Sequence, residues 1–119
     1  QNVRKRLMSE KATAIQYGGM GMSRRMLEVL ADIDRALSVE ENEGLTLIRQ
    51  KMWSQLSADG VTLIETKSMS FDPTKMEAIT AIPPTEEFPA NTVIEEIESG
   101  YLYKDRVLMP AKVVVASEQ

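Results

Sequence analysis

Hydrophobic residues in the first third of the chain recur at the spacing of an amphipathic helix. Most steps between them are three or four residues, which is the period of a helix face or a coiled-coil seam. The positions are Val3, Leu7, Ala14, Tyr17, Met22, Met26, Leu30, Ile33 and Leu37. No proline precedes Pro73, so the pattern predicts one long helix over residues 1 to about 39.

The length of this predicted helix indicates a dimer. At 1.5 Å per residue the helix is about 60 Å long, whereas a globule of this chain length has a radius of gyration of roughly 13–14 Å. The helix therefore cannot be covered by the rest of its own chain, and its apolar stripe needs a partner. Because a second copy is the simplest partner, we predict a homodimer.

Three glycines interrupt the helical pattern, at Gly18, Gly19 and Gly21. Each costs about 1 kcal/mol relative to alanine in a helix interior. The segment has three possible forms: a kink, a close approach of two backbones, or a helix with a weak point. We expect the last of these, a continuous but locally weak helix.

A second, shorter helix is predicted over residues 44–58. A polar break over residues 40–44 precedes it, and Asp59-Gly60 ends it in the manner typical of helix C-termini. Its apolar residues form one stripe, with Trp53 beside them as a packing residue: Leu45, Ile48, Met52 and Leu56.

Beyond Gly60 the pattern changes to short strands separated by turns. The predicted strands are residues 61–65, 92–98, 101–103, 107–109 and 112–115, with a short apolar run at 76–82. Prolines at 83, 84 and 89 bound a loop, and Lys104-Asp105 forms a hairpin tip. We therefore predict an α+β fold. Residues 1–58 form the helical dimerisation region, and residues 59–119 form a small all-β domain with one compact sheet.

The residue types present argue against catalysis. The chain has no histidine and no cysteine, so it lacks the commonest general base, thiolate metal ligands and disulfides. Four acidic residues, Asp72, Glu77, Glu86 and Glu87, lack the loop spacing of a calcium site, and no glycine-rich phosphate loop is present. We expect no enzymatic activity, no metal and no cofactor. Cysteine-free composition suits the cytoplasm or, alternatively, the mitochondrial matrix.

Charge is distributed unevenly along the chain. Residues 1–25 hold six basic residues and one acidic residue, a net charge of +5, whereas the remainder holds eight basic and 17 acidic residues, a net charge of −9. A basic arm is one signal of nucleic-acid binding. We interpret it instead as a solvated helix face, because no aromatic residues are interleaved with it. No apolar run approaches the ~20 residues that span a bilayer, so neither nucleic acid nor membrane is an expected partner.

Several short motifs in the last third occur in the same order as in a known family. They are Phe71-Asp72-Pro73, Glu77-Ala78, Asn91-Thr92-Val93, Gly100-Tyr101, Arg106-Val107-Leu108 and Pro110-Ala111 before alternating valines. The start of the chain also fits, through residues 2–6 and through Asp34-Arg35-Ala36-Leu37. Over nearly its whole length the chain resembles the GrpE family, the nucleotide exchange factors of DnaK-type heat-shock chaperones.

The resemblance implies a function based on binding. Two long helices would pair, the second helices would complete a four-helix bundle, and the sheet domain would hold open the nucleotide-binding domain of the chaperone, so that ADP leaves. The residues implied at the dimer interface are Met26, Leu30, Ile33, Leu37, Leu45, Ile48, Met52 and Leu56. The alternative is a structural coiled-coil protein or adaptor with a different partner.

The resemblance also implies which residues contact the chaperone. Arg106 matches an arginine that contacts the nucleotide-binding domain, and Gly44 matches a turn glycine at which a side chain would intrude on the partner. Gly44 has a simpler interpretation as a turn residue that needs special backbone angles. Four basic residues on the long helix are further candidates: Arg35, Arg4, Lys5 and Arg6.

Two single positions and one short segment depart from the family pattern. Met76 stands where the family usually has histidine, which removes a polar contact at this edge of the sheet domain. Met109 stands where the family often has a second basic residue, which lowers the positive charge around Arg106. The glycines at 18–21 replace ordinary helix formers.

Overall fold

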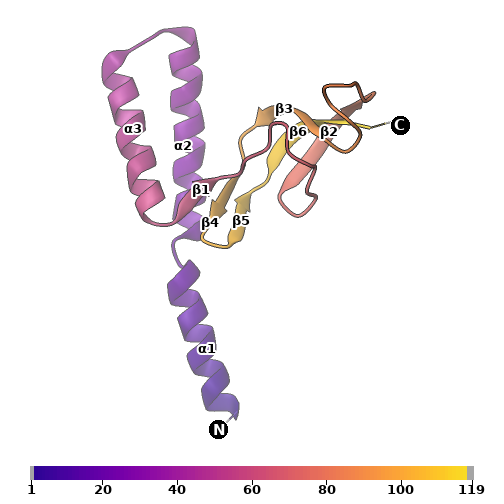
Figure 1. Cartoon of the computed structure of the whole chain (residues 1–119). Helices are drawn as coiled ribbons and strands as arrows, with labels where there is room; N and C mark the ends of the chain where they lie inside the picture. The colour runs from indigo at the N-terminus through magenta and orange to yellow at the C-terminus, as the bar shows by residue number, and fades with distance from the viewer. Residues whose placement is uncertain (1, 118–119) are drawn as a thin grey trace. The chain divides into compact units, whose positions relative to one another are not determined.

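The computed structural model describes residues 2–117 and contains three helices followed by six strands (Figure 1). The helices are α1 (Asn2–Tyr17), α2 (Met20–Val39) and α3 (Glu43–Ala58). The strands are β1 (Val61–Leu63), β2 (Met76–Ile82), β3 (Val93–Glu98), β4 (Tyr101–Tyr103), β5 (Arg106–Met109) and β6 (Ala111–Ala116). The chain divides into two compact units, one ending at Gly60 and one beginning at Val61. The predicted α+β fold is confirmed.

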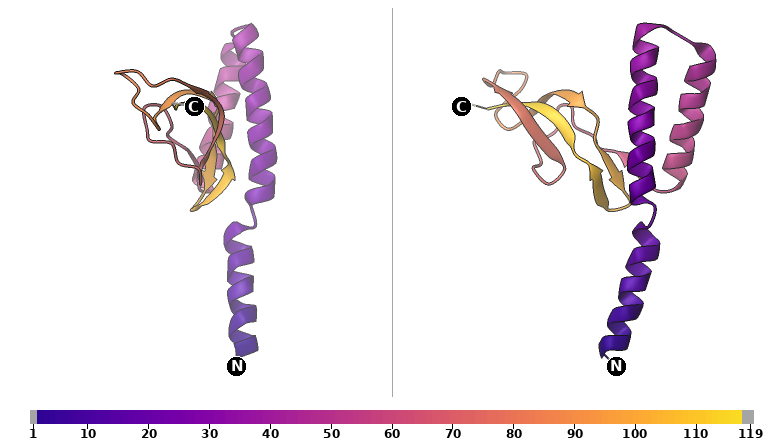
Figure 2. Two further views of the ribbon diagram at one scale, coloured as in Figure 1. Left: turned by 90° about the vertical axis from the view of Figure 1, so that its right-hand side faces the viewer. Right: turned by 180° about the vertical axis from the view of Figure 1, so that it is seen from behind.

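The long N-terminal helix spans the expected range, but it is built in two pieces (Figures 1 and 2). The interruption consists of Gly18 and Gly19, which form a turn between α1 and α2. A Cβ atom on Gly18 would lie 2.8 Å from the carbonyl oxygen of Ala14, so the local backbone is shaped for glycine. The expectation of a continuous helix is wrong at these two residues. Each glycine makes the helix about 1 kcal/mol less favourable than alanine would, so the backbone leaves the helical conformation at two adjacent glycines.

A short connection joins α2 to α3. At Glu40 the backbone becomes extended, with φ −150° and ψ 125°, and α2 ends. Asn42 then caps α3, because its side-chain oxygen accepts a hydrogen bond of 2.9 Å from the backbone N–H of Leu45. Such a cap satisfies one of the donors that the first helical turn leaves unpaired. The predicted polar break is confirmed, and α3 begins one residue before the predicted start.

Helices α2 and α3 contact each other within the first unit. An ion pair links them: Asp34 accepts two hydrogen bonds from the Arg49 guanidinium, at 2.8 and 3.2 Å. Leu30 of α2 and Leu56 of α3 are both buried in the single chain. Part of the apolar stripe predicted for a partner is therefore covered without one.

The strands form two three-stranded sheets, where the sequence pattern suggested one. The first has the order β1-β4-β5 and is antiparallel, whereas the second has the order β2-β6-β3 with β2 parallel to β6. Pro110 is the only residue between β5 and β6. Proline has no N–H to donate to a sheet ladder, so the chain leaves one sheet at Met109 and enters the other at Ala111.

The core of the second unit surrounds β6. Alternate residues of β6 are buried, as expected of a central strand with one face on a core. The core residues are Ile64, Met76, Val93, Ala111, Val113 and Val115, with Phe71 and Leu102 packed against them. Met76 is thus a core side chain, and its apolar character suits this position in the chain.

Candidate functional site

The β4–β5 hairpin presents a short cationic tip. Tyr103 pairs with Arg106 across the hairpin, and Lys104 and Asp105 form the turn between them, as predicted. Lys104 has a φ of 55°, in the left-handed region that non-glycine residues seldom adopt outside tight turns. Its Nζ atom lies 5.4 Å from the centre of the Tyr103 ring, within cation–π range. The turn therefore has a defined conformation.

Each strand of this hairpin carries a buried residue. Tyr103 and Leu108 are buried, whereas Arg106 is exposed at the start of β5. The hairpin thus holds the Arg106 backbone on a packed strand while its side chain is exposed to solvent. The guanidinium group of arginine is planar and permanently charged, and it can form two hydrogen bonds to one carboxylate.

Gly44 lies in the first turn of α3 and is exposed. Its φ is outside the left-handed region, and the atom nearest to a Cβ added at this residue would be the Asn42 Oδ1 atom, at 3.4 Å. The interpretation of Gly44 as a turn residue that needs special backbone angles is therefore wrong. The described chain has room for a side chain at this position.

Arg35 is exposed on α2 and forms an ion pair with Asp32, one helical turn earlier. It lies outside the α2–α3 ion pair, which uses the neighbouring Asp34 and Arg49. Arg49 was not among the residues singled out from the sequence. The signal was available, because Arg49 is four residues after Leu45 and three before Met52 and so shares the apolar stripe of α3.

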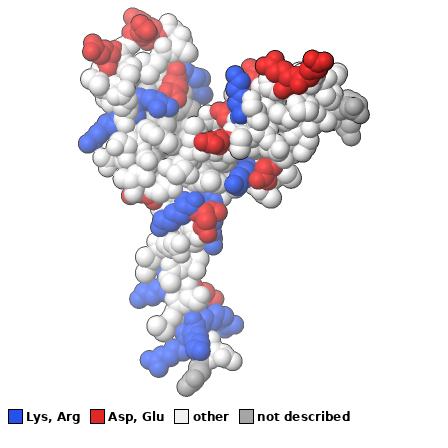
Figure 3. Space-filling model, viewed as in Figure 1, with Lys and Arg blue, Asp and Glu red and all other residues white. Residues whose placement is uncertain are grey.

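The basic residues Arg4, Lys5 and Arg6 are all exposed on α1, and no residue of α1 is buried. Figure 3 shows basic side chains gathered towards the N-terminal end of this helix, while acidic side chains gather on the visible face of the second unit. The uneven charge seen in the sequence is therefore also uneven in space.

The residues expected at a dimer interface differ in how much the single chain covers them. Leu30 is 1% exposed and Leu56 is 6% exposed, whereas Ile48 is 59% exposed. The remaining members are half-buried: Met26, Ile33, Leu37, Leu45 and Met52. Other large apolar side chains of the two helices are exposed as well, namely Met22, Val29, Val39 and Leu47. The interface itself stays a prediction.

The carboxylates considered for a metal site do not converge. The pKa of Asp72 lies below its ordinary value of 3.8, because the carboxylate accepts hydrogen bonds from the Thr74 hydroxyl and the Thr74 backbone N–H. Asp72 thereby stabilises its own turn. Among residues 2–117, no three acidic side chains are grouped so as to hold a metal ion.

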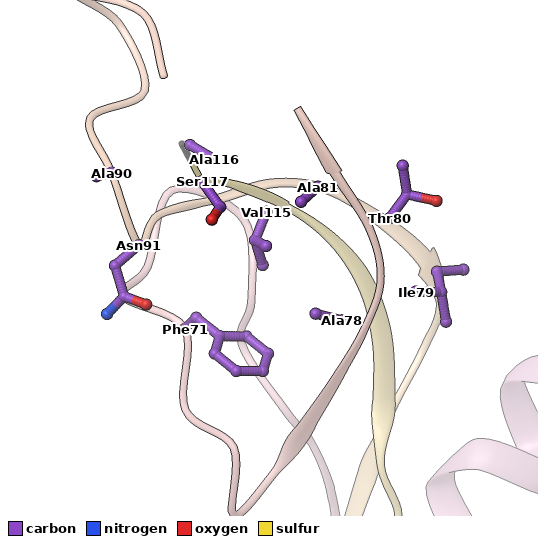
Figure 4. A pocket seen from close by; sticks show the side chains of 10 residues that line it. All are labelled: Phe71, Ala78, Ile79, Thr80, Ala81, Ala90, Asn91, Val115, Ala116 and Ser117. Carbon is purple, nitrogen blue, oxygen red and sulfur yellow. The ribbon is translucent and has the colours of Figure 1, made fainter. Parts of the chain in front are cut away.

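A shallow hollow of about 590 Å³ lies on the second unit (Figure 4). Its lining carries no charged residue: Phe71, Ala78, Ile79, Thr80, Ala81, Ala90, Asn91, Val115, Ala116 and Ser117. Such a surface offers apolar contact and no acid–base group. Separately, no helix within the described part of the chain has the length and apolarity needed to cross a membrane.

Comparison with known proteins agrees with the sequence motifs. The family model described as GrpE matches residues 1–117. The chain is 34% identical over 120 residues to "Protein GrpE" of Pediococcus pentosaceus, covering 97% of this chain and 63% of that protein. It is 36% identical over 124 residues to "Protein GrpE" of Carboxydothermus hydrogenoformans, covering 99% of this chain and 63% of that protein. The chain thus spans less than two thirds of the length of these two relatives.

Proposed function

The chain belongs to the GrpE family, and we propose that it acts as a homodimeric co-chaperone in the cytoplasm. It binds the nucleotide-binding domain of a DnaK-type chaperone and promotes release of ADP. The observation that carries this proposal is the family match over residues 1–117. The exposed Arg106 on the β4–β5 hairpin supports it, because the matched arginine of the family has the contact role.

The proposed mechanism is linkage between two binding events. A factor that binds the open form of the nucleotide-binding domain more tightly than the closed form shifts the chaperone towards the open form. ADP dissociates faster from the open form, and by reciprocity bound nucleotide weakens the factor's own binding. No acid, base or metal is required for this activity, and the candidate contact residues are cations and one glycine.

Each candidate contact has a separate part in this mechanism. Arg106 supplies a charged fork for a carboxylate of the chaperone. Gly44 leaves space on α3, so that the chaperone surface can approach the helix backbone. Arg35 can exchange its exposed pair with Asp32 for an acidic group of the chaperone at little cost, because exposed ion pairs contribute only about 0–1 kcal/mol. Arg4, Lys5 and Arg6 extend the positive surface along α1.

In the proposed dimer, the long helices pair through a stripe of α2 that lies next to the stripe already buried within the single chain. Ser23, Leu27 and Leu30 are buried in the single chain. Adjacent positions of α2, exposed or half-buried, follow alternating steps of four and three: Met22, Met26, Val29, Ile33 and Ala36. This is the heptad spacing of a two-stranded coiled coil. The seam retains Met26 and Ile33 from the predicted interface and assigns Leu30 to the interior of the chain.

The function is tested by measuring how fast a fluorescent ADP analogue leaves a bacterial DnaK-type chaperone after rapid mixing with unlabelled nucleotide. We expect the chain to accelerate release, and we expect ATP to dissociate the complex of the two proteins on a sizing column. Unchanged ADP release, together with an intact dimer by sedimentation equilibrium, would refute the exchange activity. That result would favour the alternative of a coiled-coil adaptor with another partner.

A further inference from the structure

Strand β2 has an open edge. It pairs with β6 on one side and has no sheet partner on the other within the described chain. Of its seven residues, all except Met76 are exposed. Because alternate residues of a strand direct their N–H and C=O groups to opposite sides, about half of these groups face away from β6. An edge of this kind can accept a further strand.

The opposite edge of the same sheet is closed by two features. Ser68 and Met69 form hydrogen bonds with the backbone of Val93, at 3.1 and 2.9 Å, and Ser70 bridges to Thr92. Strand β3 also carries three glutamates, the type of charged residue that protects sheet edges. Strand β2 carries only one charged residue, Glu77 at its beginning. The two edges of the sheet therefore differ in their readiness to accept a strand.

Apolar side chains accompany the open edge. The apolar side chains of Ile79 and Ile82, both on β2, are 46% and 41% exposed. The hollow of about 590 Å³ adjoins the same strand, and Figure 4 shows Phe71, Ala78 and Val115 around it. A strand laid along β2 could place apolar side chains into this hollow while its backbone pairs with the edge.

The charge around β2 selects a cationic occupant. Strand β2 and the loop after it, residues 76–92, contain three glutamates and no lysine or arginine. Lys75 precedes β2, and Lys112, opposite Glu77 on β6, forms an ion pair with Glu98 of β3. Glu77 lies at the beginning of β2, and Glu86 and Glu87 lie in the loop that follows the strand. Two copies of β2 side by side would bring these like charges together, which destabilises strand pairing. A peptide that carries lysine or arginine gains from the same charges.

We propose that the open edge of β2 binds an extended peptide that combines apolar and basic residues, by adding it to the sheet as a further strand. The carboxylates beside the edge attract the basic residues, and the uncharged hollow receives the apolar ones. This peptide site is separate from the proposed exchange activity, because it uses neither Arg106 nor the helices.

The binding test uses a fluorescein-labelled, end-blocked peptide of about eight residues that alternates valine and lysine, a typical strand length. Fluorescence anisotropy against the full chain is expected to show saturable binding that weakens as salt rises. A peptide of alternating valine and glutamate is the matched probe and should bind at least about tenfold more weakly. Equal binding of the two peptides would overturn the assignment of a cationic occupant.

Two variants locate the site. Ile79→Lys should weaken binding of the valine–lysine peptide about tenfold or more by placing a charge on the edge. Ile97→Lys is the matched control, because Ile97 lies on β3 and is 49% exposed, close to the value for Ile79. Equal losses in both variants, or none in either, would remove β2 as the site. Circular dichroism of each variant checks that the sheets are intact.

Two further measurements test the mode of binding without disturbing β2. A peptide N-methylated at alternate residues cannot donate those hydrogen bonds, so it should bind about tenfold more weakly; unchanged affinity would overturn strand addition. The double variant Glu86→Gln plus Glu87→Gln should bind less tightly and with less salt dependence, and an unchanged salt response would overturn the role of these carboxylates.

Sedimentation of Ile79→Lys tests whether a second copy of the chain occupies the edge. If the sedimenting mass of this variant is half that of the wild-type protein, a second copy pairs with β2 and the peptide proposal is wrong. ADP release should be the same for Ile79→Lys and wild type, so failure here is distinguishable from failure of the exchange activity.

Discussion

Gly100 lies directly against the backbone of Ala111. A Cβ atom on Gly100 would be 2.3 Å from the Ala111 nitrogen and 2.7 Å from its Cα atom, distances that real Cβ atoms essentially never show. The carbonyl oxygen of Gly100 also accepts a hydrogen bond of 2.9 Å from the N–H of Ile64. Glycine is therefore required at this position by the space available, where the chain turns from β3 into β4 and meets the start of β6.

Gly100→Ala should destabilise the second unit. The added methyl group meets backbone atoms, which cannot move aside as a flexible side chain could, and overpacking of this kind costs about 1–3 kcal/mol or more. The measurement is the free energy of unfolding from urea denaturation followed by circular dichroism. Gly21→Ala is the matched control, because a Cβ at that helical position would meet no atom within 4 Å beyond its chain neighbours and the backbone of its own helix. It should leave stability unchanged or raise it by up to about 1 kcal/mol, and a Gly100→Ala midpoint equal to wild type would contradict the close contact.

Arg106→Ala should weaken binding to the chaperone while the fold stays intact. Truncation of one partner of a buried charge pair costs about 2–5 kcal/mol, and the exposed Arg106 side chain is not part of the core of its own chain. Isothermal calorimetry gives the affinity, and circular dichroism checks the fold. Lys67→Ala, which removes an exposed cation from the loop between β1 and β2, should bind like wild type. Wild-type affinity in Arg106→Ala would exclude Arg106 from the contact.

Gly44→Asp should separate folding from function. In the first turn of α3 an aspartate interacts favourably with the helix dipole, by about 0.3–1 kcal/mol, and it replaces the poor helix former glycine. The variant should therefore be at least as stable as wild type in a thermal melt. Its side chain and charge should nevertheless reduce chaperone binding and ADP release. Gly44→Ala tests bulk without charge, and undiminished exchange activity in both variants would place this turn in solvent.

Stability should depend on Asp72 at neutral pH and cease to do so in acid. The folded-state pKa of Asp72 lies below 3.8, so the folded state favours the ionised form, and the contribution is present above the unfolded pKa and lost as pH falls through the folded pKa. The thermal midpoint of Asp72→Ala should lie below that of wild type at pH 7, and the difference should shrink below about pH 4. A difference of the same size at pH 7 and pH 3 would show that the hydrogen bonds from Thr74 do not depend on ionisation.

Gly18→Ala plus Gly19→Ala should extend the helix across the interruption. Each alanine gains about 1 kcal/mol of helix propensity, and a continuous helix would remove the short approach of position 18 to the Ala14 carbonyl oxygen. The far-ultraviolet helix signal should rise and persist to higher temperature. Earlier melting or loss of the dimer would instead indicate that the glycines are needed for a close approach between backbones.

Local sequence patterns predicted the elements well and their partners less well. The hairpin tip at Lys104-Asp105 and the polar break before α3 follow from residues that are neighbours in the chain. Pairing of β2 with β6 joins residues about 35 apart, such as Met76 and Ala111, and no local pattern specifies it. The division into two sheets at Pro110 was missed for the same reason.

The helical stripes show a second limit of sequence patterns. Periodicity identifies apolar positions on a helix, but the stripe of α2 is wide enough to serve both α3 and another partner. Leu30 was assigned to the dimer, yet it is buried in the single chain. The Asp34–Arg49 pair was also missed, because the sequence places Arg49 on the apolar stripe of α3 but does not identify its partner on α2.

The absence of any buried residue in α1 has a consequence for how the protein responds to dilution. A 16-residue helix with no buried residue is marginal in water, so in the proposed dimer its helical state depends on association and therefore on mass action. The second unit has its own core, and its secondary structure should not change with concentration. Helix content per chain should consequently fall on dilution through the dissociation constant, with the strand signal unchanged. The number of helical residues per chain would then depend on the concentration of the protein.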